Sequence, residues 1–354
     1  MKKLMIAVAA IAMFASSAYA ADWNFYGNAR FYTFYESVDH NTPGTDDTDN
    51  TVWATSPYSR IGANVKVSDE LSGRFEWDIA SDIRIRLLYG EWNFGAGSLL
   101  VGQDWTPTNI FGSNQVGATE LGLGGLGEMG GDRTGQLKLK MGGFRLALAT
   151  PDVNAMDDTT GVTLKDDDYA GVAYDTEVKI PQILASYRFA GDNWSVKGVA
   201  GYQKFDLENQ SVSSYIVGIG GDVAFGAATL YASIHSGENI GNLQNGAATG
   251  GALTDGSYAV VDGTTVIDNE NLSCRFIVNY VFNDMISAEI GYGYTENELD
   301  TPGAVSDEAQ SYYINLPINL APGVILTPEI GVVDEKEDGQ DKTTYYGAHW
   351  RINF

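Results

Sequence analysis

The feature that most constrains the fold is an alternation of apolar and polar residues, which recurs in segments of about ten residues to the end of the chain. In the final segment, Tyr346, Trp350 and Phe354 fall on one face, and His349 and Arg351 fall on the other. This two-residue period is the pattern of a β-strand with two different faces. Further segments of this kind cover residues 23–36, 60–67, 74–79, 136–141 and 286–294. No stretch after residue 20 has apolar residues at helical spacing, so the sequence predicts an all-β protein.

The connections between these segments are of two kinds. The short ones cover residues 68–72, 95–97, 142–143, 190–193, 226–227, 283–284 and 321–323. The long ones are polar and acidic, and cover residues 39–51, 152–168, 206–212, 236–271, 297–308 and 334–342. Short turns at one end and long loops at the other are typical of a transmembrane antiparallel β-barrel, with the short turns in the periplasm and the long loops outside the cell. Counting the alternating segments gives about sixteen strands.

A soluble β-sandwich is the main alternative, because its strands alternate too. Aromatic residues near the segment ends favour the membrane barrel, which needs an aromatic girdle at each interface. These residues are Tyr35, Trp92, Phe94, Tyr280, Phe282, Tyr292, Tyr294, Trp350 and Phe354. The mean hydropathy of −0.15 excludes a bundle of membrane helices, but in a barrel every second residue faces water.

One segment does not fit the simple alternation. A period of two puts Arg84 and Arg86 on the face of Leu88 and Trp92, which should meet lipid. A lipid-facing arginine costs about 2–4 kcal/mol at the membrane midplane. Either the strand starts after Arg86, or this face meets a neighbouring subunit, and the sequence leaves both open.

The N-terminus predicts export. Two lysines in the first three residues precede an apolar run at 4–14, and small residues follow up to Ala-Tyr-Ala at 18–20. This is the layout of a secretory signal peptide, although an uncleaved anchor helix is the alternative. We therefore expect residues 1–20 to be a signal peptide and residues 21–354 to form one barrel domain.

The charge balance limits the partners. The chain has 21 Lys and Arg against 46 Asp and Glu, a net charge of −25, which becomes 19 − 46 = −27 without the two lysines of the signal segment. This argues against a nucleic-acid partner, which requires a basic surface. The single cysteine, Cys274, excludes an intramolecular disulfide framework and a multi-cysteine zinc site. It alternates with apolar residues and is interpreted as a small apolar filler.

Motifs for cofactors and catalysis are weak. Residues 122–127 match the dinucleotide pattern G-x-G-x-x-G, but more glycine and then an alternating strand follow instead of a helix. Glycine here allows sharp bends and close approach to a wall. The three histidines, His40, His235 and His349, lie far apart without ligand spacing. We expect no cofactor, no metal site and no enzymatic activity.

Two acidic clusters, 46–49 and 166–168, lie in predicted loops. They lack the glycine and the final glutamate of a calcium-binding loop. Solvated loop charge is the simplest interpretation, and weak divalent-cation binding beside anionic lipopolysaccharide is an alternative.

Five short motifs, in this order and spacing, resemble those of the Gram-negative general porin family. They are Tyr26-Gly27, Ser59-Arg60-Ile61-Gly62, Gly97–Trp105, Gly127–Asp132 and the terminal Phe354. The resemblance implies a homotrimer of sixteen-stranded barrels in the outer membrane of a Gram-negative bacterium, in contact with outer-membrane lipid and lipopolysaccharide. It also implies a third loop, at about 104–133, that folds into the lumen and faces a basic ladder on the wall.

Some pore residues follow from this resemblance. Glu128 and Asp132 match the acidic residues of the loop, and Arg60 matches the wall arginine. Asn28 and Gln103 stand where the family usually has basic residues, so Arg30, Arg74 and Lys138 are expected to supply that charge. The complete expected lining is Arg30, Arg60, Arg74, Glu76, Asp78, Gln103, Glu128, Asp132, Arg133 and Lys138.

A sixteen-stranded barrel is wide enough for an aqueous channel. We expect passive diffusion of ions and small hydrophilic solutes, with a cation preference set by Glu128, Asp132, Glu76 and Asp78. A channel selective for a sugar or an anion is the nearest alternative, marked by an aromatic slide or a lysine cluster in the lumen. A non-conducting structural or adhesive barrel is a second alternative. A barrel enzyme is a third, but the scattered histidines offer no catalytic set.

Overall fold

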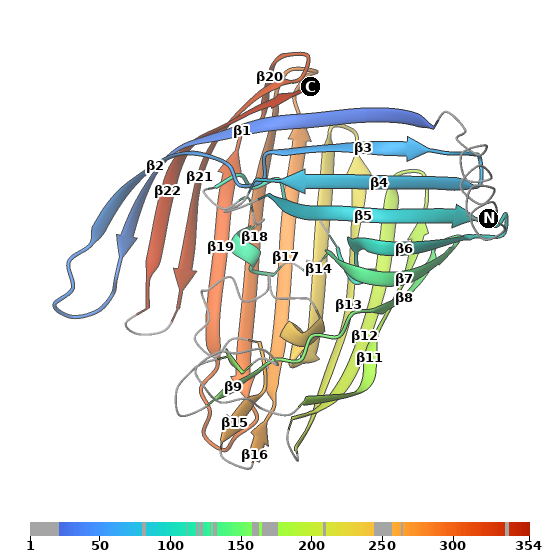
Figure 1. Cartoon of the computed structure of the whole chain (residues 1–354). Helices are drawn as coiled ribbons and strands as arrows, with labels where there is room; N and C mark the ends of the chain where they lie inside the picture. Colours follow the sequence, from blue (N-terminus) through green and yellow to red (C-terminus); the bar gives the residue numbers. More distant parts are fainter. Residues whose placement is uncertain are drawn as a thin grey trace, which may run out of the picture.

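In the computed structural model, the described residues are 21–79, 83–110, 112–117, 120, 123–127, 129, 133–157, 163–164, 176–207, 210–243, 257–262, 265–336 and 340–354. They form one large antiparallel sheet that closes on itself and one small sheet. Figure 1 shows the strands wrapping around an interior that the connection between β6 and β7 enters. Among the described residues, no helix is long and apolar enough to span a membrane.

The wall is built from strands with the following bounds: β1 Asp22–Asp39, β2 Thr48–Thr55, β3 Arg60–Lys66, β4 Leu71–Asp78, β5 Arg84–Asn93, β6 Ser98–Trp105, β7 Arg133–Met141, β8 Phe144–Ala149, β11 Thr176–Ala190, β12 Trp194–Leu207, β13 Gln210–Phe225, β14 Ala228–Glu238, β17 Asn269–Val281, β18 Ser287–Leu299, β19 Asp307–Asn315, β20 Ile318–Ala321, β21 Val324–Glu335 and β22 Lys342–Asn353.

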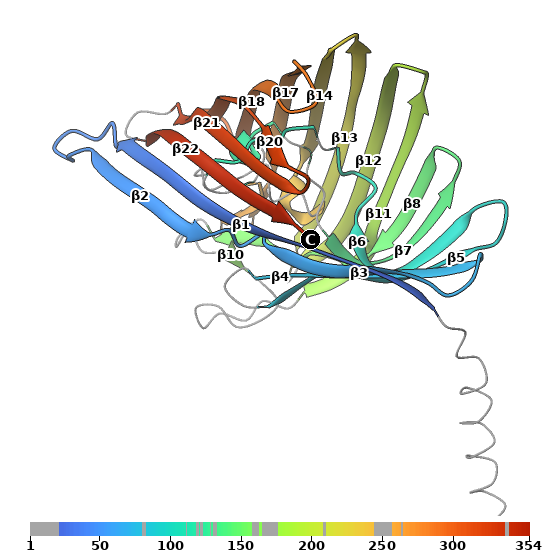
Figure 2. The same cartoon turned by 90° about the horizontal axis from the view of Figure 1, so that it is seen from above.

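These eighteen segments make sixteen wall strands. β2 and β3 both pair with β1 and are two halves of one interrupted strand. β19 and β20 both pair with β21 in the same way, which gives 18 − 2 = 16. β1 then pairs with β22 from Asn28↔Asn353 to Asp39↔Lys342 and closes the barrel, as Figure 2 shows. Closure pairs the edges that an open sheet would expose, and the predicted fold class is confirmed.

The two faces of the wall differ as the alternation predicts. On β13, Val217 and Ile219 are 53% and 52% exposed on the outer face, whereas Ser214 and Ile216 are buried inside. Outward apolar side chains of this kind meet the hydrocarbon of a membrane.

Aromatic pairs two residues apart mark the end of the barrel that carries the short turns. The outward pairs are Trp23–Phe25, Trp92–Phe94, Tyr187–Phe189 and Tyr280–Phe282, with ring centroids 4.3–5.8 Å apart. All eight rings are exposed on the outer surface. They form the aromatic girdle expected at one membrane interface.

The arginines that did not fit the alternation are explained by a β-bulge. The register between β4 and β5 runs Asp78↔Arg84 and Trp77↔Ile85, and then skips to Glu76↔Leu87, so Arg86 is the extra residue. Ile85 and Leu88 remain outside, while Arg86 is buried in the lumen. Both alternatives from the sequence are therefore wrong, since the strand begins at Arg84 and the arginines face inward to meet carboxylates.

Some connections between the wall strands also contain regular secondary structure. A four-stranded sheet of β9 (Ala155–Asp157), β10 (Thr163–Leu164), β15 (Val260–Asp262) and β16 (Thr265–Ile267) lies at the long-loop end of the barrel, at the bottom of Figure 1. Its residues pack on the inner face of β12 and β13 through Phe205, Leu207 and Val212. Two short 3-10 helices, η1 (Leu123–Gly125) and η2 (Ile240–Leu243), complete the described elements.

Candidate functional site

The connection between β6 and β7, here called loop 3 (residues 106–132), crosses the lumen and is held by two carboxylates of the opposite wall. Glu289 on β18 accepts from the backbone amide and the side-chain amide of Asn114, at 2.6 and 2.7 Å. Glu329 on β21 accepts from the backbone amides of Val116 and Gly117, at 2.8 and 2.6 Å. Both glutamates are buried, and a buried donor or acceptor that loses its partner costs about 1–3 kcal/mol. The predicted infolding of the third loop is confirmed.

Two buried tyrosines strengthen the same attachment. The Tyr345 hydroxyl donates to Glu329 at 3.0 Å and accepts from Gln115 at 2.5 Å. The Tyr313 hydroxyl donates to Glu289 and lies 2.8 Å from the hydroxyl of Ser113. Each wall carboxyl group is thus surrounded by hydrogen-bond donors from loop 3 and from a tyrosine of the wall.

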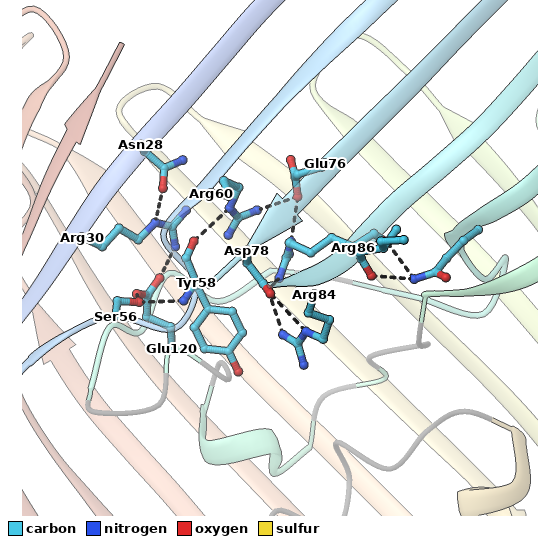
Figure 3. A network of polar contacts seen from close by, with 12 residues as sticks. Asn28, Arg30, Ser56, Tyr58, Arg60, Glu76, Asp78, Arg84, Arg86 and Glu120 are labelled. Atoms are coloured by element: carbon cyan, nitrogen blue, oxygen red, sulfur yellow. Dashed lines mark hydrogen bonds and ion pairs between the residues drawn. The ribbon is translucent and has the colours of Figure 1, made fainter. Parts of the chain in front are cut away.

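Near its midpoint, loop 3 approaches the wall at the barrel closure through Glu120. Its carboxylate is ion-paired with Arg30 and accepts from Tyr32 at 2.8 Å and from Ser56 at 2.5 Å, as Figure 3 shows in part. The His349 Nε2 lies 3.2 Å away. Burial opposes ionisation, but the contact with His349 and the charge of Arg30 hold the pKa of Glu120 at about 2. Glu120 therefore bears its charge at neutral pH.

The part of loop 3 around Gly127 touches the wall more closely than a side chain allows. The amide of Gly127 donates to Thr295 at 2.8 Å, and its φ is +68°. A Cβ at Gly127 would clash with the carbonyl oxygen of Cys274. Leu123 and Leu126 are fully buried beside it. Glycine is required here for close approach, as the sequence indicated, and not for a nucleotide.

A second group of charges, the arginine cluster, lines the wall formed by β1 and β3–β5 (Figure 3). It consists of Arg30, Arg60, Arg84 and Arg86 with Glu76, Asp78 and Glu120, which Figure 3 labels, and of Arg74, which pairs with Glu76. Glu76 lies 2.7 Å from Arg86, and Asp78 lies 2.8 Å from Arg84 and 2.9 Å from Arg86. The expected lining residues Arg30, Arg60, Arg74, Glu76 and Asp78 are thus brought together.

The remaining expected residues are distributed differently. Lys138 lies in the lumen, pairs with Asp104 and donates to the carbonyl of Trp105 at 2.7 Å. Arg133 lies over the Trp105 ring, 4.7 Å from its centroid, where loop 3 rejoins the wall. Glu128 and Asp132 lie outside the described residues.

Gln103 does not line the lumen, contrary to expectation. It lies opposite Leu88 on the neighbouring strand and two residues after Val101 on its own strand. Both of these side chains are exposed on the outer face, so Gln103 is on that face too. Its amide donates to the carbonyl of Ile85 at 2.8 Å. The side chain therefore provides a hydrogen-bond donor for a backbone carbonyl beside the bulge.

A cavity of about 1050 Å³, here called the basic cavity, lies between the start of loop 3 and the short-turn end of the barrel. Of the described residues that line it, six are basic and one, Asp222, is acidic. The basic residues are Lys138, Lys140, Arg145, Arg188, Lys197 and Arg275.

Sequence reasoning missed a second infolded segment. All four residues of η2 are buried, and Ile240 and Leu243 pack in one apolar cluster with Leu184 and Ile216 of the wall and Met129 of loop 3. The signal was the apolar pair at 240 and 243, at the start of an otherwise polar connection. Glu120 was missed as well, although it is an acidic residue inside the predicted infolded loop.

Within the described residues, no three His, Cys, Asp or Glu side chains come close enough to hold a metal ion. The acidic cluster at 166–168 lies outside those residues.

Comparison with known proteins places this geometry in a family. The family model of the Gram-negative porins matches residues 7–338. The chain belongs to the Gram-negative porin family. No curated protein sequence matches this porin. It is an outer-membrane channel protein, and its predicted family is confirmed.

Solved structures share the fold of this porin. The outer membrane channel DcaP of Acinetobacter baumannii is 16% identical, with a TM-score of 0.71, over 94% of this chain and 97% of that one. The anion-selective porin from Comamonas acidovorans is 13% identical, with a TM-score of 0.61, over 94% and 100%. The trimer form of OmpT of Vibrio cholerae is 14% identical, with a TM-score of 0.55, over 94% and 99%. At these identities the likeness concerns the fold alone.

Proposed function

We propose that this porin is a water-filled channel for the passive diffusion of ions and small hydrophilic solutes. The observation that supports this most directly is the fixed path of loop 3. The loop is attached to Glu289 and Glu329 on one side of the lumen and reaches Arg30 through Glu120 on another. A loop held at several points narrows a sixteen-stranded barrel without needing to move, so that size limits which solutes pass.

Single-channel recording in a planar bilayer tests this proposal. We expect stable steps of conductance from the purified, refolded protein, and uptake of small sugars by liposomes that contain it. A folded barrel that gives neither would support the alternative of a structural or adhesive protein.

The ion preference is a separate question. The cation preference expected from the sequence stays a prediction, because Glu128 and Asp132 lie outside the described residues. Glu76 and Asp78 contribute little to it, since arginines hold both. The basic cavity favours the second candidate, an anion-preferring channel. The sign of the reversal potential in asymmetric KCl distinguishes the two.

Export and assembly complete the proposal. Residues 1–20 act as a signal peptide, so mass spectrometry of the protein from outer membranes should show a chain that starts at Ala21. The protein assembles as a homotrimer among outer-membrane lipid and lipopolysaccharide. The trimer form of a protein with a similar fold supports this, and native mass spectrometry in detergent tests it.

A further inference from the structure

The basic cavity differs from the rest of the charged lumen in how its cations are partnered. In the arginine cluster, the carboxylates of Glu76 and Asp78 face several guanidinium groups. In the basic cavity, Lys138 is paired with Asp104, and Lys140 is 2.8 Å from Glu91. The other basic side chains are held in a different way.

Three of them donate to uncharged oxygens. Arg145 donates to the backbone carbonyls of Gly142 and Phe144, at 2.6 and 2.8 Å. Arg188 donates to the hydroxyl of Ser195 at 3.0 Å. Lys197 donates to the carbonyl of Asn109, in loop 3, at 2.5 Å. Among the described residues, no carboxylate lies within ion-pair distance of these three cations.

The remaining basic residue of the described lining is Arg275. It is buried on β17 and donates to Ser233 at 3.0 Å and to the carbonyl of Ile110. Among the described residues that line the cavity, Asp222 is the only one with a carboxylate, and it accepts a hydrogen bond from the Ser195 hydroxyl. With Lys138 and Lys140 neutralised by their partners, Arg145, Arg188 and Lys197 against Asp222 give an excess of 3 − 1 = 2 positive charges among the described lining residues.

An excess of positive charge in a confined space attracts anions strongly, because low-dielectric walls focus the field. Guanidinium groups bind carboxylate and phosphate groups through paired hydrogen bonds, and lysine adds a point charge. A solute with several charged groups can contact cations from different strands at once. A volume of about 1050 Å³ exceeds what a small solute needs, so such a solute keeps water around it and can leave.

We propose that the basic cavity is a binding station for small anions that carry two or more carboxylate or phosphate groups, on their path through the channel. This rests on the proposed channel function. Arg188 and Lys197 are the main contacts for the anion. They lie opposite each other on neighbouring strands, β11 and β12, and neither forms an ion pair with a described carboxylate.

Current block in single channels tests the proposal. Citrate and pyrophosphate are added in turn, on either side, at about 0.1 M KCl, where charges act over about 10 Å. We expect transient blocks whose frequency rises with the concentration of the anion. The double variant Arg188→Gln with Lys197→Gln should shorten the blocks at least tenfold. Block by citrate alone or by pyrophosphate alone assigns the station to carboxylates or to phosphates.

The control is Lys66→Gln with Lys336→Gln, which removes the same charge from side chains outside the cavity that are 60% and 40% exposed. It should leave the blocks unchanged. Blocks of equal length in both double variants, or no blocks by either anion in a conducting channel, would overturn the binding station. A channel that does not conduct at all would instead overturn the proposed function.

Discussion

The backbone amide of Gly117 donates to the carboxylate of Glu329 at 2.6 Å, and the two residues are 212 positions apart in the chain. Most of the contacts that fix loop 3 at Glu289 and Glu329 start from the backbone of the loop. Every residue except proline has an amide hydrogen, so this attachment depends on the wall carboxylates more than on the side chains of the loop.

Loss of these carboxylates should therefore loosen the loop. We expect the double variant Glu289→Gln with Glu329→Gln to give a noisier open-channel current and faster liposome uptake of larger sugars, by about tenfold. The physical reason is that an amide replaces one of the two acceptor oxygens of each carboxyl group, and a buried donor left without its acceptor costs about 1–3 kcal/mol. Glu270→Gln, on an exposed side chain of β17, is the control and should change neither. Unchanged noise and uptake in the double variant would show that other contacts hold the loop.

The contact of Glu120 with Arg30 should depend on pH in a defined way. Because its pKa falls from 4.5 to about 2, the ionised carboxylate stabilises the fold fully above about pH 5, and this is lost as the pH falls toward 2. Comparing the unfolding free energies of wild type and Glu120→Gln isolates this group. We expect a difference of about 3 kcal/mol at pH 7 that shrinks below pH 4.5. A difference that grows on acidification would contradict the assignment.

The bulged arginine should be important for stability. Arg86→Met leaves Glu76 and Asp78 short of a buried partner, and we expect the free energy of unfolding to fall by about 3 kcal/mol. Lys66→Met breaks an exposed pair with Asp69 and should have no measurable effect. Urea unfolding in lipid vesicles measures both. Equal effects would mean that solvent screens the arginine cluster as it screens the surface.

The second infolded segment should open when its apolar contacts are removed. Leu243→Ala creates a cavity beside Ile216 and Leu184, at a cost of about 3 kcal/mol. Hydrogen exchange of the η2 amides should then accelerate by about a hundredfold. Val305→Ala, at a side chain that is 75% exposed, is the control. Unchanged protection in the leucine variant would mean that the segment is held by its polar contacts instead, such as those between Asn154 and Asn242.

The wall of this barrel could be predicted because each residue on a strand faces either lipid or the interior. The last strand, with Trp350 and Phe354 outward and His349 inward, shows how directly this choice fixes the pattern. The bulge at Arg86 could not be predicted because one added residue shifts the alternation, so that the residues after it change faces. In the sequence, arginines alternate with apolar residues in either case.

The site was less accessible to prediction. Glu120 meets Ser56 and His349, which lie 64 and 229 positions away, and sequence pattern carries no information on such contacts. The family resemblance predicted that Gln103 lines the lumen. In the structure its side-chain amide donates to the carbonyls of Ile85 and Arg86 at the bulge, on the outer face. The alternation of residues predicts which face of the wall a side chain is on. Contacts across the lumen depend on how the whole barrel closes, which the alternation does not predict.

The aromatic pairs at the short-turn end have a consequence for how the barrel evolves. Amphipathic rings prefer the boundary between hydrocarbon and headgroups, so four such pairs fix the depth at which the barrel sits from the periplasmic side. The long loops leave from the opposite ends of the strands and contribute none of these four pairs. Long loops can thus lengthen or shorten over generations, for example to escape phages or antibodies, while the narrow part of the lumen stays at the same height in the membrane.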